Sequence, residues 1–179
     1  MVMTIRFSSI IPLLAAMAGA CSFSVEADLP DVEITQHGLS IPGVPKGKVP
    51  GDVSVSGSFT FSSSNTAWAK NMNSAIFVRQ VTVTAQSGLE NLDFIKSARM
   101  TMSDPALSES TVDIASYDRC DDRPSSSVIE VSMPTPIDIT TLWSADRTVI
   151  ALEVTGRVPE QTWSVDLTMK LTGQITYKY

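Results

Sequence analysis

The sequence predicts an all-β fold, an antiparallel β-sandwich of Ig-like or jelly-roll-like type with about seven or eight strands. Three observations lead to this fold class. Apolar and polar residues alternate with a period of two through most of the chain after residue 51. Turn-forming residues recur about every ten to fifteen positions, and helical spacing is confined to two short stretches. A closed barrel is the alternative arrangement of the same strands.

The predicted strands can be justified in order along the chain. In residues 53–61, apolar residues alternate with serine and threonine, which places the hydroxyl side chains on the solvent face. Residues 75–84 alternate less strictly because Arg79 interrupts the apolar parity, so we expect both faces to be partly covered. Residues 159–162 are expected to form a hairpin loop between the last two strands. The remaining strands are expected at residues 98–103, 111–117, 129–133, 150–158 and 163–177.

Two segments have helical spacing and are expected to be short helical connectors. Residues 65–73 have the composition of one or two helical turns, with Ser64 as the N-cap. Residues 87–90 have the spacing of a capping box, and the apolar residues that follow, up to position 95, fall on one helical face.

Composition limits the function classes. The 179 residues include 13 Lys and Arg against 19 Asp and Glu, and no stripe of basic residues is present, so nucleic-acid binding is not expected. A single histidine excludes a site built from several histidines. The hydrophobic fraction of 43% is too high for a disordered chain and suits one domain with its own core.

The first twenty residues have the pattern of a secretory signal peptide. Arg6 is their only charged residue, and an apolar run of about a dozen residues follows it and ends in small residues. That run is shorter than the roughly twenty residues that a membrane-spanning helix needs. We therefore assign residues 1–20 to a signal segment outside the fold.

The end of this segment is more specific. Ala18-Gly19-Ala20-Cys21 resembles the lipobox of bacterial lipoproteins, although Ala18 stands where that class usually has leucine. The resemblance implies cleavage after Ala20, a lipid on Cys21 and anchoring in a membrane. Ser22 in place of Asp is similar to the pattern of outer-membrane retention, so we expect an outer-membrane protein that faces the periplasm or the cell surface. The alternative is an ordinary signal peptide with Cys21 free or paired with Cys120.

Residues 21–51 are expected to form a lipid-anchored tether, and residues 52–179 a single β-sandwich domain. Four prolines and four glycines fall between positions 30 and 51, a density typical of an extended spacer broken by turns. One stretch inside the tether, residues 32–36, alternates and is a candidate edge strand packed on the domain.

No catalytic arrangement stands out, and the chain is not expected to be an enzyme. His37 lies in the predicted tether, and no Gly-x-Ser-x-Gly motif is present, so a solvent-exposed histidine is the expectation. Three strand carboxylates, Glu130, Glu153 and Asp166, fall on the polar parity of their strands and are expected on solvent faces.

The segment around Cys120 is rich in acidic side chains. Its carboxylates offer oxygen ligands for calcium, but their spacing is not that of a calcium loop, and arginines lie between them. We therefore expect a charged loop rather than a metal site, with Cys120 at the surface and no cofactor.

The expected function is binding, either of another envelope protein or of a polysaccharide. Loops of a sandwich commonly carry such sites, and residues 62–74 and 116–127 are the candidate loops. Trp163 and Trp143 are expected to pack in the core, although Trp143 is also considered for the surface. The alternative function is a carrier of lipid or another apolar ligand between the sheets. The candidate contact residues are Trp68, Trp143, Tyr117, Asp118, Asp121 and Asp122.

Overall fold

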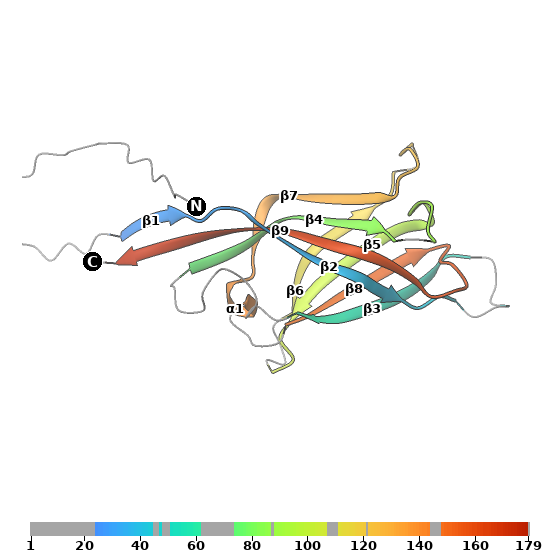
Figure 1. Cartoon of the computed structure of the whole chain (residues 1–179), viewed down its shortest axis with the longest axis horizontal. Coiled ribbons are helices and arrows are strands. Elements are labelled where there is room, and N and C mark those ends of the chain that lie inside the picture. The colour runs from blue at the N-terminus through green and yellow to red at the C-terminus, as the bar shows by residue number, and fades with distance from the viewer. Residues whose placement is uncertain are drawn as a thin grey trace, which may run out of the picture.

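Two antiparallel sheets pack face to face in the computed structural model, which confirms the predicted β-sandwich (Figure 1). The structure describes residues 24–44, 47, 51–61, 74–86, 88–106, 111–120, 122–143 and 148–178. The signal segment, Cys21, Trp68, Asp121 and the helix expected at residues 65–73 lie outside these ranges.

The first sheet contains five strands: β1 (Ser24–Asp28), β2 (Val32–Ile41), β4 (Ser74–Ala85), β7 (Val128–Asp138) and β9 (Trp163–Lys178). β9 pairs with β4, and β4 pairs with β7. The other edge of β9 pairs with β2 along its first part and with β1 along its last part. The second sheet has the order β3, β8, β5, β6, formed by β3 (Val53–Phe61), β8 (Thr148–Gly156), β5 (Ile95–Ser103) and β6 (Thr111–Asp118).

The core lies between the two sheets and follows the alternation seen in the sequence. Every second residue of β9 from Trp163 to Leu171 is buried, and on β8 Ile150, Leu152 and Val154 are buried in the same way. Residues of opposite parity on these strands are polar or small, apart from Val149, and reach solvent to varying extents. The seven predicted strands therefore all exist, each with ends shifted by a few residues at most except β7, which runs five residues further.

The predicted tether is wrong for the segment from Ser24 to Ile41, because β1 and β2 are part of the first sheet. β2 pairs with Trp163–Leu171, and β1 continues along β9 to Lys178. The candidate edge strand at residues 32–36 is confirmed and extends to Ile41. Of the prolines and glycines that suggested a spacer, Gly38 alone lies within β2, and the others lie before or after it in the chain.

A β-bulge explains why the alternation was visible only as far as residue 36. Gln36 lies opposite Leu167 and Leu39 opposite Val165, so His37 and Gly38 share one partner, Asp166. The extra residue reverses the parity. Leu39 and Ile41 therefore point into the core although they have the opposite parity to the apolar residues before the bulge.

The expected hairpin at residues 159–162 is also wrong. β8 lies in the second sheet and β9 in the first, so the connection crosses between the sheets. Val158 is buried, and the carbonyl of Pro159 accepts a hydrogen bond from the backbone N–H of Val44 at 3.0 Å. Alternation defines the two faces of a strand but does not show which sheet it joins.

The helix expected over residues 87–95 is wrong, because the described residues 88–94 form turns and bends. Gly88 has a positive φ of 101°, which suits a turn, and Ile95 already begins β5. The helix that the described residues do contain, α1 (Thr140–Trp143), begins where Oδ1 of Asp138 accepts from the N–H of Thr140 at 2.8 Å. No helix in the described ranges is long and apolar enough to span a membrane.

The starts and ends of the strands define two ends of the sandwich. β1 begins, β4 begins and β9 ends at one end, which we call the near end (Figure 1). β2, β4, β6 and β8 all finish at the opposite end, which we call the far end. The segments that follow these four strands, 42–52, 86–94, 119–127 and 157–162, are the far-end loops.

Candidate binding surfaces

Two of the far-end loops are tied together by a charged contact. Oδ1 of Asp93, in the loop after β4, accepts from Nη1 of Arg119 at 2.9 Å and from the backbone N–H of Ser126 at 3.3 Å. The hydrogen bond from the Ser125 side chain, with that from Arg119, holds the pKa of Asp93 below its ordinary value. The N–H of Leu92 also donates to the carbonyl of Ser126 at 2.9 Å. These contacts fix the relative position of the two loops.

The candidate loop 116–127 belongs to this far-end group and offers carboxylates rather than an aromatic face. Asp118 and Asp122 are exposed, as is Cys120, which agrees with the expectation for that thiol. Tyr117 is buried, and the guanidinium carbon of Arg123 lies 5.2 Å from the centre of its ring. Tyr117 therefore packs in the core and supplies no exposed ring for a partner.

The tryptophans are also interior residues where the structure describes them. Trp143 is buried at the near end, with its ring 5.5 Å from that of Phe61. Trp163 is buried and meets Phe94 edge to face at 5.1 Å. Both agree with the core role, and the surface role considered for Trp143 is wrong.

The two candidate loops do not share one end of the sandwich. The other candidate loop, 62–74, falls outside the described residues except for Ser74. Its flanking residues, Phe61 and Ser74, pair with Thr148 and Ile175, which lie at the near end. Of the two loops that the sequence suggested as binding sites, loop 116–127 is therefore the one that lies at the far end.

His37 lies next to a carboxylate that the sequence did not connect with it. Nδ1 of His37 donates to Oδ2 of Asp166 at 2.9 Å, and Oδ1 of Asp166 accepts from the N–H of Gly38 at 2.8 Å. The bond from His37 keeps the pKa of Asp166 below its ordinary value, and the Gly38 N–H adds to this. In the described part of the chain, no other side chain bonds the His37 ring. The pair fixes the bulge.

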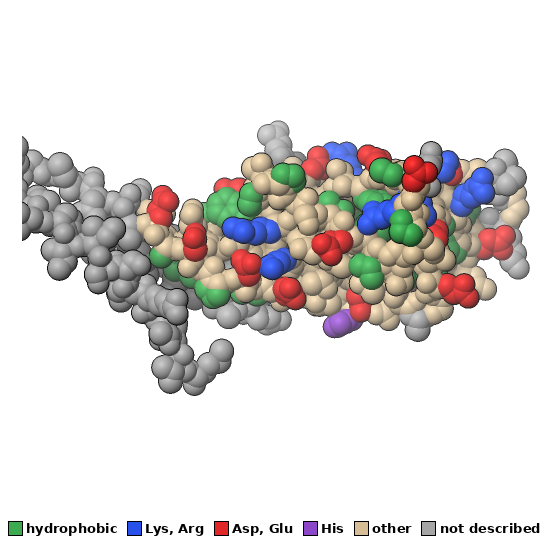
Figure 2. Space-filling view, turned by 90° about the horizontal axis from the view of Figure 1, so that it is seen from above, with side chains coloured by type: hydrophobic (Ala, Val, Ile, Leu, Met, Phe, Trp, Pro, Cys, Tyr) green, Lys and Arg blue, Asp and Glu red, His purple; other side chains and the backbone are tan. Residues whose placement is uncertain are grey.

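The remaining carboxylates are scattered over the surface. Glu130 and Glu153 are exposed, as their parity predicts. Asp113 forms a bidentate ion pair with Arg99, in which both nitrogen–oxygen distances are 2.7 Å. This ion pair lowers the pKa of Asp113. Figure 2 shows acidic and basic side chains interspersed on one face. The described residues contain no group of three or more potential metal ligands.

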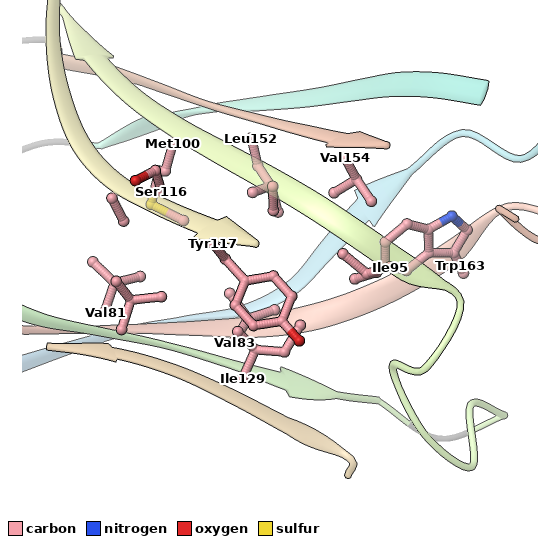
Figure 3. A pocket seen from close by; sticks show the side chains of 13 residues that line it. Val81, Val83, Ile95, Met100, Ser116, Tyr117, Ile129, Leu152, Val154 and Trp163 are labelled. Carbon is pink, nitrogen blue, oxygen red and sulfur yellow. The ribbon is translucent and has the colours of Figure 1, made fainter. Parts of the chain in front are cut away.

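The space between the sheets is small. An apolar gap of about 20 Å³ lies among side chains that include Val81, Tyr117 and Leu152 (Figure 3). Such a volume holds about one water molecule. Trp163 also borders the gap, and its buried Nε1 has no hydrogen-bond partner among the described residues.

A much larger groove, of about 470 Å³, runs along the side of the sandwich between β6 and β7. Its walls include Ala115 from β6 and Val131, Met133 and Ile137 from β7. Alternation did not predict this groove, because it does not show which strands lie at sheet edges. The two prolines in β7 are the signal that was available, since proline inside a strand favours an edge position.

Comparison with known proteins identifies no family for this chain. No protein-family model and no curated protein sequence matches this chain. A decameric BFDV capsid protein is similar in structure at 12% identity, covering 86% of this chain and 98% of its own, with a TM-score of 0.37. A 60-mer of BFDV capsid protein has 9% identity, coverage of 86% and 93%, and a TM-score of 0.34. TM-scores at this level carry no argument about what this chain does.

Proposed function

We propose that this chain is a lipoprotein of the bacterial outer membrane that works by binding a partner in the cell envelope. The observation that carries the proposal is the lipobox-like Ala18-Gly19-Ala20-Cys21 at the end of a signal-peptide pattern. The β-sandwich that follows would then be the part that meets the partner.

The short distance between Cys21 and the sheet supports a definite orientation. β1 begins at Ser24, three residues after Cys21, and three extended residues span about 10 Å at most. A lipid on Cys21 would hold the near end of the sandwich against the bilayer. The far-end loops would then point away from the membrane, toward a partner.

The far-end loops also have properties that favour binding. The contacts of Asp93 order them before any partner arrives, which lowers the entropy lost on association. Asp118 and Asp122 remain exposed there. A gap of only 20 Å³ between the sheets favours a surface site over the carriage of an apolar ligand.

Two measurements test the proposal. Metabolic labelling with a radioactive fatty acid should label the chain, and the Cys21→Ala variant should carry no label. A photo-crosslinking residue placed at Asp122 should capture a partner in intact cells, whereas the same residue at exposed Thr60 of β3, near the opposite end, should not. An unlabelled chain would refute the anchor. Equal capture at the two positions would refute the far-end site.

A further inference from the structure

The edge strands of the two sheets approach each other on both sides of the sandwich; we call the β2–β3 side the closed side and the β6–β7 side, which holds a groove, the open side. On the closed side, β2 and β3 approach so closely that a Cβ on Gly57 would lie 3.1 Å from the carbonyl oxygen of Ser40. On the open side, β6 pairs only with β5 and β7 pairs only with β4 among the described strands. The groove of about 470 Å³ lies between these two unpaired edges.

The walls of the groove combine apolar side chains with a free strand edge. Ala115, Val131, Met133 and Ile137 are each only half-buried, although they face the groove next to the core. The small interior gap shares Ala115, Ser116 and Val131 with the groove, so the two spaces adjoin. An apolar side chain entering from the groove would thus continue the core.

The edge that can accept a further strand is β6. In β7, the register passes from Ser132 opposite Gln80 to Ile137 opposite Val78, so the four residues between them bulge away from β4. Two of those four are Pro134 and Pro136, which have no N–H to donate. β6 has eight residues, no proline and a single-residue bulge at Ile114, so alternate residues on each side of that bulge present backbone donors and acceptors at its outer edge.

Apart from Arg99, which lines the groove and is paired with Asp113, the charges on the two strands that border it are acidic. Asp113 and Asp118 lie on β6, Glu130 and Asp138 lie on β7, and neither strand contains Lys or Arg. Among the described residues, Asp113 is the member of this set that has an ion pair, with Arg99. A second copy of the chain would bring the same carboxylates against these, whereas a basic segment would be attracted.

We propose that an extended, basic segment of another protein adds to β6 as a fifth strand of the second sheet. Its apolar side chains would alternate toward Val131 and Met133, and its Lys or Arg side chains would lie near the carboxylates. This surface is separate from the far-end loops and needs no lipid on Cys21, so the inference goes beyond the proposed function.

A synthetic peptide tests the inference on the full chain in detergent micelles. The probe is an alternating Lys-Val peptide of eight residues, the length of β6. Saturable binding is expected by fluorescence anisotropy, with new protection of β6 amides from hydrogen exchange. N-methylation of every second peptide residue removes one hydrogen-bonding edge and should weaken binding by at least about tenfold. A Glu-Val peptide should not bind.

Protein variants locate the site. Glu130→Lys, on β7, should weaken binding of the Lys-Val peptide by about threefold at low salt. Glu33→Lys reverses an exposed charge on β2, the opposite edge of the first sheet, and should leave binding unchanged. No saturable binding, equal binding of the N-methylated peptide, or protection on β2 or β3 would overturn the inference. None of these outcomes affects fatty-acid labelling or crosslinking at Asp122.

Discussion

Gly156 is the position where one added methyl group should do most damage. It ends β8 and lies opposite Val53 on one side and Ile95 on the other. A Cβ there would fall inside van der Waals distance of the carbonyl oxygen of Phe94 and 3.0 Å from the backbone nitrogen of Lys96. Both obstacles are backbone atoms, so relief requires the far-end loop after β4 to move.

The cost of Gly156→Ala follows from two losses. Overpacking against fixed atoms costs about 1–3 kcal/mol. Displacement of the Phe94 carbonyl also breaks its 2.9 Å hydrogen bond from the N–H of Arg157, worth about 0.5–1.5 kcal/mol. The free energy of unfolding should therefore fall by about 2–4 kcal/mol. Urea denaturation followed by tryptophan fluorescence measures it.

Gly173→Ala is the matched control, since it adds the same methyl group to a strand of the other sheet. The nearest obstacle there is Cδ1 of Leu29 at 2.7 Å, the end of a side chain that can rotate away. Replacing glycine also restricts the unfolded chain, a gain of about 0.4–1 kcal/mol, so the unfolding free energy should change by less than about 1 kcal/mol. If Gly156→Ala were as stable as Gly173→Ala, the close approach of Phe94 to β8 would be refuted.

Three further outcomes are expected. The lowered pKa of Asp93 means that its contacts stabilise the fold above the unfolded carboxyl pKa of about 3.9 and are lost as pH falls through the lower folded value. Asp93→Asn should therefore be less stable than the parent at pH 7 but equally stable in strong acid, and urea midpoints across pH 2–7 measure this. A constant difference at all pH values would contradict it. In a Cys21→Ala background, Cys120 should react with a thiol reagent in the folded protein, because it is exposed; reaction only after denaturation would count against this. Trp143→Ala should lower the unfolding free energy by about 3–5 kcal/mol, because its ring is buried against Phe61; a loss below about 1 kcal/mol by urea denaturation would place this ring outside the core.

Alternation was sufficient to predict the fold class because a half-buried strand needs one apolar face. The signal failed where backbone geometry changed the parity. In β2, the two residues His37 and Gly38 oppose Asp166 alone, and this bulge hid the buried Leu39 and Ile41. A bulge depends on the partner strand, and the partner, β9, lies far away in sequence.

The candidate site was harder to predict than the fold. The acidic character of residues 116–127 was visible in the sequence, but the partner of Arg119 is Asp93, 26 positions earlier. The capping-box pattern at residues 87–90 suggested a helix there, yet the chain turns and carries Asp93 to the far end. The groove could not be predicted either, because strand order across a sheet is a three-dimensional property.

The central place of β9 in the first sheet has a consequence for the order of folding. β1, β2 and β4 all pair with β9, which follows all three in the chain. Ser24 pairs with Lys178, which lies 178 − 24 = 154 positions later in the chain. At about 5–20 residues per second, synthesis takes roughly 8–30 s to cover that distance. Through that interval β1 and β2 have no partner strand, whereas β4 can pair with β7 before β9 is made.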